Sequence, residues 1–254
     1  MPEGVCRDHL ANPIMMTPTP QLKADTESDL AARYRTVCDE ILESERQYGR
    51  ETEPVTLVAV SKTHPADAVR ALSGLGHREF AENKIQEAVE KISQLSDIPD
   101  LCWHFIGSIQ SKKAKKISSL FDWVQTVDRI KIAKILNENR PESMNRLNIC
   151  IQVNPDGEKT KSGVSLEGCE DLIEEILPYK RLKIRGIMSI PKPCGSFKLQ
   201  REGFARIHSC FKQLKQKYPQ LDTLSIGMSG DYEAAIIEGS NMIRIGTRLF
   251  GERS

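Results

Sequence analysis

Eight short apolar runs recur along the chain at nearly regular intervals, and this repetition limits the folds open to it. The runs are rich in β-branched residues and span 54–62, 78–83, 102–107, 123–127, 148–154, 184–190, 223–229 and 242–246. Between them lie amphipathic segments, such as 84–95 and 204–214, with apolar residues at helical spacing. Because helical crossovers join parallel strands, the sequence predicts a parallel sheet.

Eight strand and helix units predict a single (β/α)₈ TIM barrel of the α/β class. An extra N-terminal helix is expected from Asp29, and its apolar face carries Leu30, Tyr34, Val37 and Ile41. This helix would complete the ring of helices. A doubly wound sheet is the alternative, but it would need a Gly-rich dinucleotide turn, and no G-x-G-x-x-G occurs. We expect a flexible tail over 1–28 and one barrel domain over 29–254.

Composition narrows the classes of partner. The 254 residues carry a net charge of +1, which gives no bias toward nucleic acid or membrane. The seven cysteines form no CxxC pair and no Cys/His cluster with zinc spacing, so reduced thiols and no metal are expected. No apolar run is long enough to span a membrane. We expect a cytoplasmic monomer or weak dimer, with an organelle leader in residues 1–28 as the alternative.

One lysine-rich segment, SKKAKK (111–116), raises the possibility of nucleic-acid binding. It lacks interleaved aromatic residues for base stacking and opens a predicted helix. We interpret it as a solvated helix face.

Polar residues stand at the carboxyl ends of the predicted strands, where barrels of this kind carry their active sites. They are Lys62, Asn83, His104 to Gly107, Asp128, Asn154, Ser189, Ser229, Gly246 and Thr247. Strand ends are commonly polar because loops begin there, so a single polar residue does not indicate a site. Specific combinations of residues are needed.

Lys62 follows the first run in VAVSKTHP (58–65). Alternation puts Val58, Val60 and Lys62 on one face, so the amine enters the barrel mouth if that face is the interior. Loss of hydration there would lower the pKa of the amine and supply the neutral nucleophile that Schiff-base formation requires. A snorkelling surface lysine is the alternative.

Glycines and hydroxyls follow the last two strands, in GMSGD (227–231) and RIGTR (244–248). Barrel proteins often bind phosphate in these two loops, because glycine allows close approach and leaves backbone N–H groups free to meet an anion. Ser229 and Thr247 could add hydroxyl donors. The two loops together predict a phosphate site.

Arg244 interrupts the apolar run MIRIG. A buried guanidinium needs a partner, and the spacing leaves Asp231, Glu252 and a ligand atom equally open. A Schiff-base lysine, a phosphate site and a polar contact for a ring nitrogen together indicate pyridoxal 5′-phosphate (PLP) as the cofactor.

Several segments resemble the pyridoxal phosphate homeostasis protein family, which is similar in fold to the barrel domain of alanine racemase. They are VAVSKTHP, REFAENKIQE, WHFIGSIQSKK, TVDR, KSGV, RGIMSI, LSIGMSGDYEAAI and RIGTRLFGER, in the family's order across roughly 55–253. The resemblance implies that Lys62 carries PLP as a Schiff base. It also implies that Ser229, Gly246 and Thr247 hold the phosphate, that Arg244 faces the pyridine nitrogen, and that Asn83 and Met228 line the site.

Three positions depart from the family pattern: Ala81 stands for glycine, Lys84 for tyrosine and Lys112 for asparagine. A methyl group at 81 is expected to crowd the end of the second strand, and Lys84 adds a charge near it. None of the three removes a proposed cofactor contact.

The resemblance also bears on function. An arginine at the pyridine nitrogen disfavours its protonation and weakens the ring as an electron sink. Only seven residues follow Thr247, so we expect no second domain with an opposing acid or base. We therefore predict PLP buffering, or delivery to PLP-dependent apoenzymes, without substantial catalysis.

Two enzymatic alternatives remain open. One is a slow, low-specificity amino-acid racemase with His104 or Tyr232 as second base, although a histidine between Trp103 and Phe105 is expected to be packed and hydrogen-bonded. The other is a class I aldolase, whose lysine forms its Schiff base with the substrate itself.

Overall fold

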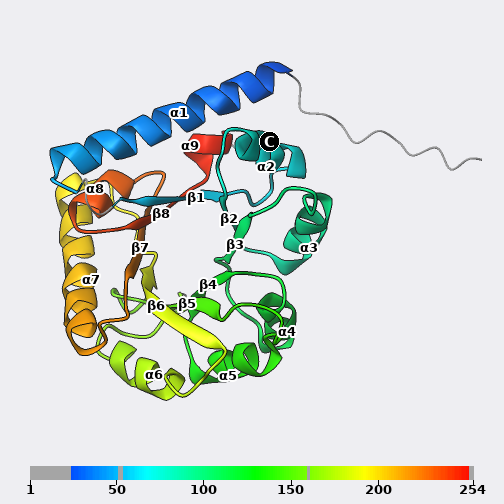
Figure 1. Cartoon of the computed structure of the whole chain (residues 1–254). Helices are drawn as coiled ribbons and strands as arrows, with labels where there is room; N and C mark the ends of the chain where they lie inside the picture. Colours follow the sequence, from blue (N-terminus) through cyan, green and yellow to red (C-terminus); the bar gives the residue numbers. More distant parts are fainter. Residues whose placement is uncertain (1–23, 51–53, 159–160, 252–254) are drawn as a thin grey trace, which may run out of the picture.

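Eight parallel strands close into a barrel in the order of the chain, as the sequence predicts (Figure 1). The computed structural model describes residues 24–50, 54–158 and 161–251. The strands are β1 (Thr56–Val60), β2 (Glu79–Glu82), β3 (Cys102–Phe105), β4 (Trp123–Val127), β5 (Leu147–Val153), β6 (Leu182–Ser189), β7 (Thr223–Met228) and β8 (Met242–Ile245). Pairing of β8 with β1, from Thr56 with Met242 to Ala59 with Ile245, closes the cylinder.

Helices surround the barrel on its outer side. They are α1 (Ala24–Gln47), α2 (Ala66–Gly74), α3 (Ile85–Gln94), α4 (Ser111–Ser118), α5 (Ile130–Asn139), α6 (Cys169–Ile176), α7 (Phe197–Lys217), α8 (Tyr232–Ile237) and α9 (Thr247–Phe250). The long helix α1 lies along α8, α9 and α2 and completes the ring, as expected (Figure 1). Its Leu30, Val37 and Ile41 are buried, and Arg33 Nε donates to the carbonyl of Leu249 at 2.8 Å.

The first helix begins earlier than expected, at Ala24 instead of Asp29. Glu27 and Ser28 are exposed. Apolar periodicity marks only the part of a helix that packs, so this polar first turn gave no signal. Residues 1–23 of the predicted tail lie outside the described residues.

Two separate apolar layers form the core of the protein. The larger lies between strands and helices, and the smaller fills the lumen with Val58, Val60, Ala81, Trp123, Cys150, Met188 and Met242. Val58 and Val60 therefore face the interior, which confirms the face predicted for β1. A side chain that continues this alternation enters the mouth of the lumen.

Within the described ranges, the six cysteines are all unpaired. In the same part of the chain, no helix has the length and apolarity needed to cross a bilayer. The lysines of 111–116 lie on α4, where Lys112, Lys115 and Lys116 are exposed while Ala114 and Ile117 are buried, which confirms a solvated helix face.

Candidate functional site

A cavity of about 440 Å³ opens at the carboxyl ends of the strands, and the seven predicted site residues all line it. They are Lys62, Asn83, Met228, Ser229, Arg244, Gly246 and Thr247. They come from the ends of β1, β2, β7 and β8 and the segments that follow. Their convergence follows from barrel closure, which brings β8 beside β1.

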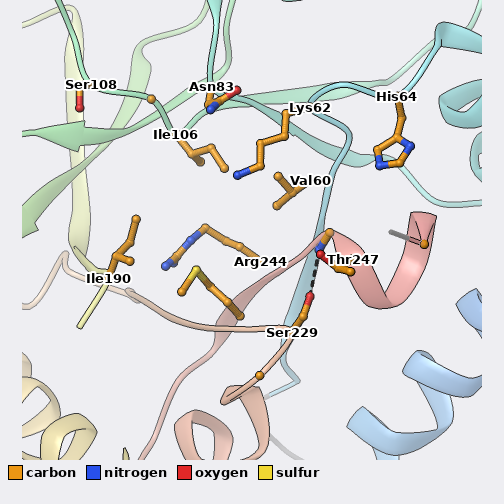
Figure 2. A pocket seen from close by; sticks show the side chains of 15 residues that line it. Val60, Lys62, His64, Asn83, Ile106, Ser108, Ile190, Ser229, Arg244 and Thr247 are labelled. Carbon is orange, nitrogen blue, oxygen red and sulfur yellow. Dashed lines mark hydrogen bonds between the residues drawn. The ribbon is translucent and has the colours of Figure 1, made fainter. Parts of the chain in front are cut away.

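Lys62 stands two residues beyond β1, and Figure 2 shows its side chain directed into the cavity near Val60 and Ile106. The backbone before it is held firmly: Ser61 donates its N–H to the carbonyl of Ala81 at 3.0 Å and its hydroxyl to Glu82 Oε1 at 2.7 Å. Thr63 has a φ of 67°, a left-handed conformation that is unfavourable for a β-branched residue. The strand thus turns away sharply and leaves Lys62 at its end.

Asn83 lies beside Lys62 at the end of β2. Its Oδ1 is buried and has no hydrogen-bond partner within the described ranges. A buried amide oxygen without a partner is unfavourable, so this atom is placed to accept a hydrogen bond from a ligand. Gly107, in the segment after β3, packs against the Asn83 backbone so closely that an added Cβ would lie 2.0 Å from the Asn83 carbonyl oxygen.

Gly107→Ala is therefore expected to displace Asn83. Because backbone atoms must shift, we expect the free energy of unfolding to fall by about 2 kcal/mol and PLP binding to weaken. Urea unfolding and PLP titration measure the two effects. Gly203→Ala is the control, since a Cβ there meets nothing within 4 Å and α7 should gain about 0.5–1 kcal/mol. Equal stability and affinity in Gly107→Ala and wild type would contradict the prediction.

The loops after β7 and β8 meet on one side of the cavity. Gly246 donates its N–H to Ser229 Oγ at 3.4 Å, and Asp231 Oδ1 accepts from the Met228 N–H at 2.7 Å. A Cβ on Gly246 would come within 3.3 Å of the Val60 carbonyl oxygen. These contacts bring hydroxyls and backbone together in a small concave surface, which suits an anion.

Arg244 extends across the floor of the cavity from β8 (Figure 2). It is 3% exposed, and its guanidinium donates to Ser225 Oγ at 2.5 Å and to the Ser189 carbonyl at 2.9 Å. Burial lowers the pKa of Arg244 to about 10, against the attraction of Asp231, so the guanidinium stays protonated at neutral pH.

Of the partners considered for Arg244 from the sequence, Asp231 does not contact the guanidinium. Asp231 acts on it through space, while the Asp231 carboxylate accepts from the backbone of Met228. Glu252 lies outside the described residues. The hydroxyl and carbonyl partners leave the positive charge of Arg244 without a contacting carboxylate in the part of the chain that the structure describes.

Further lining residues that the sequence did not predict are His64, Ser108, Ile190 and Gly251. Ile190 is the last residue of the predicted run 184–190 and directly follows β6, and that position was the available signal. His64 stacks on Phe250 with ring centroids 4.8 Å apart. Asp128, Asn154 and Ser189 of the expected rim do not line the cavity. Asp128 pairs with Arg129, the Asn154 amide donates to the Glu158 carbonyl, and the Ser189 hydroxyl donates to the Val153 carbonyl.

The three departures from the family pattern leave the cavity intact. Ala81 is fully buried in the lumen layer. Lys84 pairs with Glu87 at 2.8 Å and is 60% exposed, so its charge is directed to solvent. Lys112 lies exposed on α4.

Neither proposed second base of the racemase alternative lines the cavity. His104 is fully buried in the lumen and hydrogen-bonds Gln125 and Glu79, which confirms the packed histidine expected from its neighbours. The Tyr232 hydroxyl donates to Glu40 Oε2 at 2.6 Å, and burial raises the pKa of this tyrosine. Both groups are engaged in contacts with the protein.

Comparison with known proteins identifies the family of this chain. The model for the alanine racemase N-terminal domain matches residues 39–254. A pyridoxal phosphate homeostasis protein from Escherichia coli is 42% identical over 228 residues, covering 89% of this chain and 97% of the relative. One from Pseudomonas aeruginosa is 46% identical over 226 residues, covering 89% and 96%. The chain belongs to the pyridoxal phosphate homeostasis protein family.

Solved structures show the same architecture. PipY of Synechococcus elongatus, solved with PLP bound, is 33% identical with a TM-score of 0.76 and covers 87% of this chain and all of its own. Alanine racemase of Clostridium difficile is 13% identical with a TM-score of 0.65, covering 90% of this chain and 57% of its own. The second likeness concerns the fold alone.

Proposed function

We propose that this protein binds PLP, holds it as a Schiff base on Lys62, and acts in intracellular PLP homeostasis by buffering or delivery. The observation that carries the proposal is the convergence of all seven predicted residues on one cavity. The PLP in the PipY structure and the names of the bacterial relatives support it.

The residues present fit this cofactor. A volume of about 440 Å³ lies within the range of small-ligand pockets. Buried Asn83 Oδ1 offers an acceptor for which the described residues supply no donor. Gly246 lies beside Ser229 Oγ, and a Cβ there would come within 3.3 Å of the Val60 carbonyl oxygen. In our proposal Ser229, Gly246 and Thr247 hold the phosphate, Met228 lines the site, and Arg244 contacts the pyridine nitrogen.

The charge of Arg244 favours storage of the cofactor over catalysis with it. When bound, PLP can withdraw electrons from the α-carbon of an amino acid. A protonated guanidinium disfavours a second positive charge on the adjacent ring nitrogen and so weakens that withdrawal. The lining residues with ionisable side chains are Lys62, His64 and Arg244. The proposed role is therefore storage, with PLP-dependent apoenzymes as recipients of the cofactor. We also propose that the protein is a monomer or weak dimer in the cytoplasm.

Absorption of the purified protein tests the proposal. We expect a yellow protein whose visible band is abolished by borohydride, with pyridoxyl mass on the peptide that contains Lys62. A protein that stays colourless after PLP is added would overturn the proposal. Trapping by borohydride only in the presence of a sugar phosphate would instead favour the aldolase alternative.

A further inference from the structure

A second group of ligating side chains lies at the opposite mouth of the barrel from Lys62. Glu79 is the first residue of β2 and Cys102 the first residue of β3, while His104 follows two residues later. Parallel pairing sets Glu79 directly beside Cys102. Because Lys62 follows the far end of β1, the lumen separates this group from the cofactor cavity.

We propose that Glu79, Cys102 and His104 bind one zinc ion at the amino-terminal mouth of the barrel. Their ligand atoms all lie within 4.8 Å of one another. A thiolate, an imidazole nitrogen and a carboxylate form a mixed set typical of Zn²⁺ with three protein ligands and one position open to water.

The distances suit this ion. Zn–S and Zn–N bonds of about 2.3 and 2.0–2.1 Å at a tetrahedral angle place sulfur and nitrogen about 3.6 Å apart. Cys102 Sγ and His104 Nε2 are 3.6 Å apart. Glu79 Oε2 lies closer, 2.6 Å from the same nitrogen, and must withdraw to about 3.3 Å. Its side chain is 34% exposed at the rim, so this movement meets little packing.

The surrounding hydrogen bonds hold His104 in place. Its ring stacks on Trp123 with centroids 5.3 Å apart, and its Nδ1 accepts from Gln125 Nε2 at 2.9 Å. Ser225 donates its hydroxyl to Gln125 Oε1 at 2.7 Å. An imidazole held on its second nitrogen is the arrangement that metal-binding histidines use.

Gln125 can serve the histidine in both of its neutral tautomers. Without metal, Nε2–H of His104 donates to Glu79, and Nδ1 accepts from Gln125. With zinc on Nε2 the ring proton sits on Nδ1, and rotation of the Gln125 amide offers it Oε1 as acceptor. The amide nitrogen then donates to Ser225 Oγ, which also accepts from Arg244, so the Ser225 hydroxyl hydrogen gives up Gln125 as its acceptor.

Coordination also requires the Cys102 thiolate. In the protein without metal, burial and the neighbouring Glu79 raise the pKa of Cys102, so sulfur carries its proton. Zinc forms the Zn–S bond as that proton leaves to solvent, and no electron is transferred.

Zinc titration of the full-length protein against a chromophoric chelator tests the site. We expect one tightly bound ion per chain, weakened in Cys102→Ser by more than the about 10- to 100-fold typical for loss of an outer-shell partner. Cys194→Ser is the matched control and should bind as wild type does. Thermal unfolding verifies folding, and Glu79→Gln, at the rim, is a second variant should Cys102→Ser not fold.

Cobalt gives an independent readout. Co²⁺ in this site should show the intense visible bands of a tetrahedral complex, and Cys102→Ser should lose them. No retained ion, or equal binding in Cys102→Ser and wild type, would overturn the proposal. Lys62→Ala should keep the zinc, so failure of the metal site and failure of the PLP proposal can be told apart.

Discussion

Replacing Lys62 with alanine is expected to abolish covalent PLP binding completely. Lys62 extends into the cavity from the end of β1, and in our proposal its amine is the group that would hold the aldehyde of PLP covalently. The variant should lose the visible band and yield no pyridoxyl peptide after borohydride. The proposed phosphate contacts of Ser229, Gly246 and Thr247 remain, so weak, reversible binding is expected to persist.

Lys84→Ala is the matched control for that variant. Lys84 follows Asn83 in the chain, but it pairs with Glu87 and is directed to solvent. This variant should stay yellow and carry its label on Lys62. Label on another lysine in Lys62→Ala, at wild-type yield, would contradict the assignment.

The same two variants distinguish storage from racemisation. For a storage protein, exchange of the alanine α-proton in heavy water should proceed at the rate of free PLP. Exchange above that rate in wild type and Lys84→Ala, but not in Lys62→Ala, would establish the racemase alternative.

Replacing Lys91 with methionine is expected to lower the free energy of unfolding by about 3–5 kcal/mol. Lys91 Nζ contacts Glu82 Oε1 and donates to the Ser61 carbonyl at 2.7 Å, and the side chains of Lys91 and Glu82 are 7% and 0% exposed. Without Lys91 the Glu82 carboxylate is buried without a counter-charge. Since Ser61 precedes Lys62, the variant should also weaken PLP binding. Urea unfolding and PLP titration measure both effects.

The loss in free energy of unfolding caused by Lys91→Met should depend on pH. Burial raises the pKa of Glu82, and Lys91 opposes that rise. Without Lys91 the folded-state pKa rises further above the unfolded value, so the native state takes up a proton and stability falls as pH increases through the folded pKa. The loss relative to wild type should be smaller at about pH 5 than at about pH 8.

Two controls separate charge burial from packing. Glu82→Gln combined with Lys91→Met removes both charges and should recover most of the loss. Lys84→Met breaks the exposed pair with Glu87 and should change stability by less than about 1 kcal/mol. A double variant as unstable as Lys91→Met would show that the unpaired charge of Glu82 does not carry the effect.

Much of the fold could be predicted because it rests on local patterns. Each of the eight predicted runs contains or overlaps a strand, since strands buried on both faces need continuous apolar residues. Boundaries were less certain where no burial marks them, as in the polar first turn of α1. Alternation along β1 also placed Lys62 on the same face as Val58 and Val60, and the structure shows that these two valines lie in the lumen.

Contacts between distant residues could not be predicted in the same way. The buried pair of Glu82 and Lys91, the hydroxyl partner of Arg244 and the unsatisfied amide of Asn83 depend on which strands lie side by side. Apolar periodicity reports how much each position is buried, but it carries no information on what a buried polar atom contacts.

The amino-acid sequence by itself determined the barrel class, the order of its strands and the side on which Lys62 and the last two loops lie. These features follow from apolar periodicity and from the right-handed connection of consecutive parallel strands. Only the tertiary structure decided which polar groups meet. Glu79 stands 23 residues before Cys102, and only the pairing of β2 with β3 sets it beside that thiol and His104. Barrel closure fixes such distances, since the register between neighbouring strands is a property of the whole cylinder and not of any one strand.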